Sequence, residues 1–92
     1  SQSVFQMFDG PLCEVTLRCE NYLMTVIIDR FGEDVVTEIA DDDHFIAYVN
    51  VSVSPTFFGW IFSFSGRITL ISPEDVVGSF FETLKLIANK SH

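Results

Sequence analysis

The feature that most constrains the fold is an aromatic segment at residues 54–66. It reads S-P-T-F-F-G-W-I-F-S-F-S-G and carries five aromatic rings in thirteen residues. A helix or strand that faces one core buries about half of its side chains. A segment that is apolar on nearly every side therefore needs two partners to pack against. A hydrophobic core supplies the first partner, and the identity of the second bears on function.

Length and charge limit what the chain can do. Its 92 residues suffice for one domain with a single hydrophobic core. The 13 acidic and 5 basic residues give a net charge of −8, which opposes a phosphate backbone and disfavours direct binding of duplex DNA by this segment. No run approaches the roughly 20 apolar residues of a membrane helix, and no secretory leader pattern is present, so we expect a cytoplasmic location and no membrane contact.

Sequence periodicity predicts an arm followed by one folded domain. Residues 1–11, which end in the breaker D-G-P, are expected to be a linker or arm from an upstream domain, and residues 12–92 the folded domain. Alternation of apolar and polar residues predicts strands at residues 13–19, 35–40, 45–53 and 67–72. Helical spacing predicts a helix at residues 21–31, which Gly32 stops. A final helix follows Ser72, with Ser72 as its cap and Pro73 at its first position.

Local signals leave the aromatic segment ambiguous. Ser54 as N-cap and Pro55 at the first helical position favour a helix over residues 55–64. Alternate aromatic residues also fit a strand, and Gly59 weakens a helix. The order of elements resolves the choice, because strand, helix, strand, strand, helix, strand is the split βαβ arrangement of an α+β, ferredoxin-like sandwich (βαββαβ), here with an additional C-terminal helix. We predict the sheet order four, one, three, two.

As a helix, the aromatic segment has two apolar sides. One side fills the core of the sandwich and consists of Phe57, Trp60, Ile61 and Phe64. Phe58 and Phe62 form a second stripe, which is the candidate interface. Either a neighbouring domain, a second copy or the C-terminal helix covers that stripe. The C-terminal helix has an apolar stripe of its own, expected at Val77, Phe81, Leu84 and Ala88. A second apolar edge, at Val76 and Phe80, lies beside that stripe.

No catalytic, metal or cofactor site is predicted. Cys13 and Cys19 are about 20 Å apart on one extended strand, so they cannot form a disulfide and are expected to be reduced thiols. The acidic run at residues 41–43 lacks the glycine and distal glutamate of a calcium loop, which favours a solvated turn. No set of serine, histidine and aspartate suggests nucleophilic catalysis. We therefore expect a chain that is not an enzyme.

Polar side chains converge on the sheet face that points away from the helices. Alternation places two of the five basic residues there, on strands that become neighbours in the predicted order. This face is a candidate site for a polar or anionic ligand, or a docking face for another domain. An ordinary half-polar exposed face is the alternative interpretation. The candidate ligand-binding residues are Thr16, Arg18, Tyr48, Asn50, Arg67 and Thr69.

Five phrases, in order, resemble one known family. They are V-T-L-R-C-E-N, I-I-D-R-F-G-E-D-V, H-F-I-A-Y-V-N-V, S-P-T-F-F-G-W-I-F-S-F and I-T-L-I-S-P-E-D-V-V, with a lead-in M-F-D-G-P. Together they look like the C-terminal extension of WYL-domain transcriptional regulators. The resemblance runs from about residue 5 to the C-terminus.

The resemblance implies a bacterial regulator in which an N-terminal winged helix binds DNA and a central WYL module senses a ligand. The winged helix and the WYL module are not within this sequence. The chain would then be a non-catalytic regulatory and oligomerisation module that helps ligand sensing and dimer geometry. Its expected partners are the WYL module of the same polypeptide, a second copy in a homodimer, and a small anionic or nucleotide-like effector. The alternative is a stand-alone ferredoxin-like domain that binds a small molecule.

Overall fold

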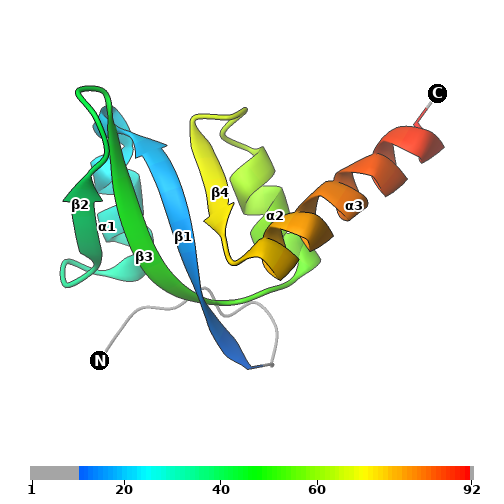
Figure 1. Ribbon diagram of the computed structural model, residues 1–92, viewed down its shortest axis with the longest axis horizontal. Coiled ribbons are helices and arrows are strands. Elements are labelled where there is room, and N and C mark those ends of the chain that lie inside the picture. The colour runs from blue at the N-terminus through cyan, green and yellow to red at the C-terminus, as the bar shows by residue number, and fades with distance from the viewer. Residues whose placement is uncertain (1–10, 92) are drawn as a thin grey trace.

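The computed structural model describes residues 11–91. Within this range the chain is an α+β domain with a four-stranded antiparallel sheet and three α-helices (Figure 1). The predicted arm at residues 1–11 lies outside the described residues, apart from Pro11. None of the described helices combines the length and apolar character needed to cross a membrane.

The sheet places the first strand at its centre. The strands are β1 (Leu12–Glu20), β2 (Val36–Ile39), β3 (His44–Ser52) and β4 (Ile68–Ser72), in the spatial order β2-β3-β1-β4. Counted from the β4 edge this is the predicted order four, one, three, two. Leu17 of β1 lies opposite Ala47 of β3 on one side and opposite Leu70 of β4 on the other. Alternation therefore predicted the strands, and the order of strands and helices along the chain predicted which strands are neighbours.

The first helical segment follows β1 directly. It begins as a 3-10 turn, η1 (Asn21–Leu23), and continues as α1 (Met24–Phe31). Gly32 ends it with φ of 99°, a value that favours glycine because it has no Cβ. The predicted stop at Gly32 is confirmed.

The aromatic segment forms a helix, α2 (Pro55–Phe62). The Ser54 hydroxyl oxygen accepts a hydrogen bond from the backbone N–H of Phe57 at 3.2 Å, and Pro55 occupies the first turn. Both features are the predicted start signals of the helix. The strand alternative is wrong, because the cap and the crossover between β3 and β4 outweigh the alternation of aromatic residues.

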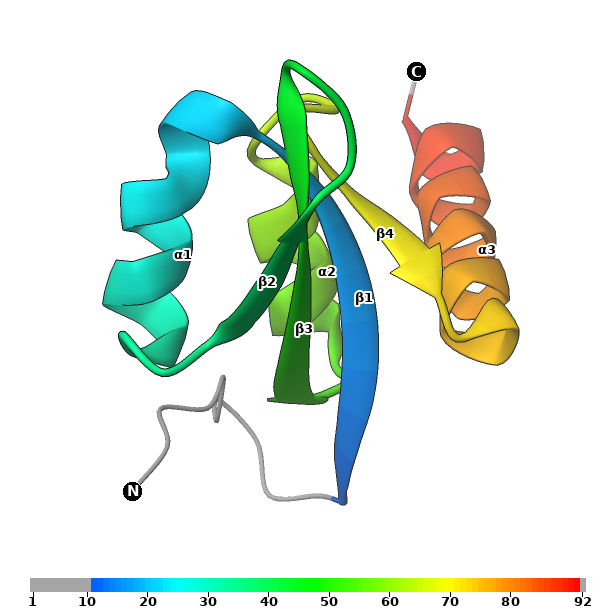
Figure 2. The ribbon, with the colours of Figure 1, turned by 60° about the vertical axis from the view of Figure 1, so that its left-hand side comes forward.

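One face of the sheet packs against α1 and α2, and the two helices lie side by side on it (Figure 2). Phe31 of α1 meets Trp60 of α2 edge to face, with ring centroids 5.7 Å apart. The predicted inward side is confirmed, since Phe57 and Ile61 of α2 are buried and Trp60 packs partly buried against the core. Phe64 also packs against the core, although α2 ends at Phe62, two residues earlier than predicted. The buried core consists of Val15, Leu17, Cys19, Leu23, Ile27, Phe31, Phe45, Ala47, Val49, Val51, Phe57, Phe58, Ile61, Ile68, Leu70 and Val76.

The last helix, α3 (Glu74–Lys90), starts next to β4 and α2 and then runs away from the sheet (Figure 1). Ser72 does not cap it, contrary to the prediction. Pro73 is the N-cap residue and offers no capping side chain, whereas Ser72 remains in β4 and donates its hydroxyl hydrogen to Thr16 Oγ1 at 2.8 Å. The pairing of β4 with β1 thus holds the serine that would otherwise cap α3.

The side of α3 that meets the core differs from the predicted stripe. Val76 is buried, and Val77 and Phe80 pack partly buried against the core, while Phe81 is 55% exposed. Val77 therefore confirms the predicted stripe and Phe81 contradicts it. The helix begins one residue later than predicted, after a proline N-cap. The other apolar edge, Val76 and Phe80, faces the core, and the Phe80 ring packs against Phe58 of α2.

Candidate functional site

Two surfaces contain the predicted site residues. The first is the open sheet face, which we define by the exposed or half-buried side chains that point away from α1 and α2: Thr16, Arg18, Tyr48, Asn50 and Thr69. Strand register brings four of them together, because Thr16 lies opposite Tyr48 and Arg18 lies opposite Thr69. Asn50 lies one pair further along, opposite Glu14.

Arg18 is bound to the turn between β2 and β3. Its Nη2 atom donates a hydrogen bond to Asp41 Oδ2 at 2.5 Å and lies 3.4 Å from His44 Nδ1. The other oxygen of Asp41 is 2.9 Å from His44 Nδ1 and accepts the backbone N–H of Asp43 at 2.8 Å. The acidic turn is therefore tied to β1 instead of being only solvated.

These contacts lower the pKa of Asp41. The hydrogen bond with His44 is the largest cause, and the backbone N–H of Asp43 and the charge of Arg18 act in the same direction. All three favour the carboxylate over the neutral acid. Asp41 therefore remains ionised and provides a negative partner for Arg18.

Tyr48 is also held by an acidic partner on the open sheet face. Its hydroxyl donates a hydrogen bond to a carboxylate oxygen of Glu38 in β2, and this bond is the largest cause of a raised pKa for Tyr48. The negative charge of Glu14 acts in the same direction. The neighbours of Arg18 and Tyr48 are thus carboxylates, a pattern that alternation within single strands did not indicate.

Arg67 occupies a different environment from Arg18. It precedes β4, and its Nε donates to the backbone oxygen of Phe64 at 2.9 Å, while Nη1 donates to the Tyr22 hydroxyl at 3.2 Å. These partners lie in the turn between α2 and β4 and in η1. The two predicted arginines therefore have separate sets of partners, and Arg67 lies just before β4 rather than on it.

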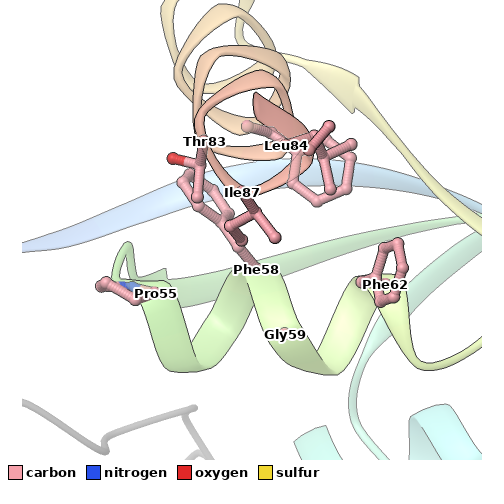
Figure 3. A pocket seen from close by; sticks show the side chains of 9 residues that line it. Pro55, Phe58, Gly59, Phe62, Thr83, Leu84 and Ile87 are labelled. Atoms are coloured by element: carbon pink, nitrogen blue, oxygen red, sulfur yellow. The ribbon is translucent and has the colours of Figure 1, made fainter. Parts of the chain in front are cut away.

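The second surface is an apolar groove of about 360 Å³ between α2 and α3, which we call the α2–α3 groove (Figure 3). Thr83, Leu84 and Ile87 of α3 face α2 across this groove, and Gly59 lies on the turn of α2 between Phe58 and Phe62. The residues that line it are Pro55, Phe58, Gly59, Phe62, Phe80, Thr83, Leu84, Ile87 and Ala88.

The two predicted interface residues, Phe58 and Phe62, differ in how far the groove exposes them. Phe58 is only 6% exposed, and its ring meets that of Phe80 at 5.4 Å between centroids. Phe62 is 65% exposed. Of the alternatives left open by the sequence, cover by the C-terminal helix applies to Phe58, whereas Phe62 stays accessible at the edge of the groove.

Comparison with known proteins gives one family. Searches of curated proteins and of solved structures found no match. The sequence profile of the WCX domain matches residues 11–88, which includes every strand and helix described above except the last two residues of α3. The chain belongs to the WCX domain family, the C-terminal extension domain of WYL-containing regulators.

Proposed function

We propose that the chain is a non-catalytic regulatory and oligomerisation module of a cytoplasmic WYL-type bacterial transcription regulator. Family membership over residues 11–88 is the observation that carries this proposal. DNA binding would reside in a winged helix upstream, and the WYL module of the same polypeptide would share the sensing of the effector. The strand order β2-β3-β1-β4 supports the finer assignment of the fold as a ferredoxin-like sandwich.

The sensing part of the proposal concerns Arg18 on the open sheet face. Its guanidinium already binds a carboxylate, that of Asp41, and both side chains are more than two-fifths exposed. A carboxylate or phosphate of a small anionic or nucleotide-like effector offers the same oxygen geometry. If the effector replaced Asp41 as the partner of Arg18, the turn between β2 and β3 would lose its contact with β1. Effector binding would therefore be coupled to movement of that turn.

The oligomerisation part concerns the apolar residues that α2 and α3 leave exposed. Phe62 and Ile87 lie at the α2–α3 groove, and Phe81 lies at an adjoining groove along α3. Large exposed apolar patches on soluble domains commonly mark interaction sites. In the intact regulator, this surface would set how two copies are arranged.

A deletion experiment tests the proposed function. The full-length regulator is compared with a version that lacks this domain, using sedimentation for the oligomeric state and a reporter under the operator for regulation. We expect the shortened protein to retain binding of DNA through its winged helix but to lose the regulated response and to dimerise more weakly. An unchanged response and an unchanged oligomeric state would contradict the proposal.

A second variant tests the effector site separately. Arg18→Gln/Arg67→Gln in the full-length protein removes both candidate cations, and we expect a weaker effector response with the fold intact. Arg30→Gln is a matched control, because Arg30 is an exposed arginine in the last turn of α1 and lies neither on the open sheet face nor in the α2–α3 groove. If the double variant responds like this control, neither Arg18 on the open sheet face nor Arg67 binds the effector, and the family assignment is unaffected.

A further inference from the structure

An apolar surface extends along α3. The α2–α3 groove adjoins a second groove of about 430 Å³ between α3, β4 and the turn that precedes β4, and Phe62, Phe80 and Leu84 line both. Phe62 is 65% exposed, Phe81 55% and Ile87 57%. Phe81 does not line the α2–α3 groove. Since a phenylalanine buries about 150–250 Å² when fully covered, Phe62, Ile87 and their neighbours in that groove expose on the order of 200–300 Å² of apolar surface per copy.

Gly59 at the floor of the α2–α3 groove is not required by the packing of its own chain. A Cβ atom at this position would meet nothing within 4 Å. Glycine inside a helix lowers stability by about 0.8–1 kcal/mol relative to alanine. Because Gly59 has no side chain, the groove stays open down to the backbone of α2, and another segment can approach closely.

The charges of α3 indicate which segment fits. Glu74 and Asp75 lie in its first turn and Lys90 in its last turn. If α3 of a second copy lies antiparallel to the first, each acidic end meets a basic end, whereas a parallel arrangement brings like charges together. An antiparallel pair is also compatible with a two-fold axis, which presents the same patch from both copies.

We propose that the α2–α3 groove is a self-association surface, in which α3 of a second copy lies antiparallel to α3 of the first and passes over Gly59. The inference rests on the proposed function and specifies the surface by which the module oligomerises. Two copies would bury on the order of 400–600 Å² of apolar surface, less than the roughly 1,200–2,000 Å² of a stable interface. The isolated domain therefore forms a weak dimer, which becomes stronger when other domains raise the local concentration.

A pair of glycine variants tests the surface. Gly59→Gln places a long side chain on the floor of the groove, and Gly78→Gln places the same side chain at an exposed position of α3 that does not line the groove. Glutamine is a better helix former than glycine, so both variants should unfold at an equal or higher temperature than the wild type when dilute. By sedimentation equilibrium, we expect Gly59→Gln to weaken the dimer about tenfold or more and Gly78→Gln to change it less than about twofold.

Charge reversal tests the orientation. Glu74→Lys/Asp75→Lys makes both ends of α3 basic, and Lys85→Glu/Lys90→Glu makes both ends acidic. We expect each variant alone to dimerise about tenfold more weakly at low salt, and an equimolar mixture to associate again as a heterodimer. In a parallel pair, reversal at one end would still leave like charges facing each other, so neither variant would weaken the dimer.

The outcomes separate this inference from the proposed function. A wild-type chain that stays monomeric up to its solubility limit overturns both the inference and the oligomerisation role. If Gly59→Gln leaves the dissociation constant of the dimer unchanged, or if both charge reversals do, the inference alone is overturned. The module would then oligomerise through another surface.

Discussion

The rings of Phe58 in α2 and Phe80 in α3 meet edge to face, with their centroids 5.4 Å apart. Together with the buried Val76, this contact fixes the first half of α3 to the rest of the domain. From Lys85 onward every described residue of α3 is exposed. The helix is thus anchored at one end and accessible at the other, which is the arrangement that leaves the α2–α3 groove open.

Removal of the Phe58 ring should destabilise the domain far more than removal of the Phe62 ring. Phe58 is buried in the core, so Phe58→Ala should lower the free energy of unfolding by about 3 kcal/mol through lost burial and a cavity. Phe62→Ala removes a largely exposed ring and should change it by less than about 1 kcal/mol in a dilute sample. Urea unfolding measures both. Equal losses would mean that α3 does not cover Phe58 as described.

Acid should abolish the contribution of Asp41 to stability. Its pKa is lowered in the folded chain from the ordinary value of 3.8, chiefly by the hydrogen bond with His44. A depressed folded-state pKa contributes stability that is present above the unfolded value and is lost as the pH falls through the folded value. The difference in unfolding free energy between wild type and Asp41→Asn should therefore shrink as the pH falls below about 4. A difference that does not change down to about pH 2 would contradict the contact.

The two cysteines should differ in reactivity. Burial raises the pKa of Cys19 to about 12, so at pH 8 only on the order of one thiol in 10,000 is ionised, and the side chain is fully buried. Cys13 is partly accessible. With a thiol-specific reagent, we expect one equivalent to react quickly in the folded protein and the second to react only on unfolding. Cys13→Ser should remove the fast phase, and a fast phase that survives this substitution would place Cys19 at the surface.

The domain should not bind duplex DNA. Its net charge of −8 repels the phosphate backbone, and counterion release offers no gain to a chain with so few cations. Fluorescence anisotropy with a labelled duplex at physiological salt should show no binding up to about 100 μM protein. A salt-sensitive micromolar affinity would require a role in DNA recognition that the proposed function does not include.

The sequence was sufficient to predict the backbone arrangement. Period-two alternation predicted the four strands, and their order follows from the crossover that α2 makes between β3 and β4. The helical state of α2 was also predictable, because the cap at Ser54 and the proline that follows it are local signals. Such signals act through a few neighbouring residues and need no knowledge of tertiary contacts.

Tertiary contacts explain what could not be predicted. Ser72 and Pro73 have the composition of a helix start, but Ser72 binds Thr16, which is distant in sequence. The partner of Arg18 is Asp41 in a turn whose position depends on the register of β3 against β1. On α3 both flanks are apolar, so composition alone could not decide whether Phe80 or Phe81 faces α2. Each of these outcomes depends on residues more than twenty positions apart or on the phase of a helix.

The central position of β1 affects how the chain can be synthesised and truncated. β1 is complete by residue 20, yet its second neighbour, β4, begins only at Ile68. Until β4 emerges from the ribosome, the backbone hydrogen-bonding groups on that side of β1 have no partner strand, next to apolar residues such as Leu17. Open strand edges of this kind promote aggregation. Nascent chains and fragments that end before residue 68 should therefore depend on chaperones to remain soluble.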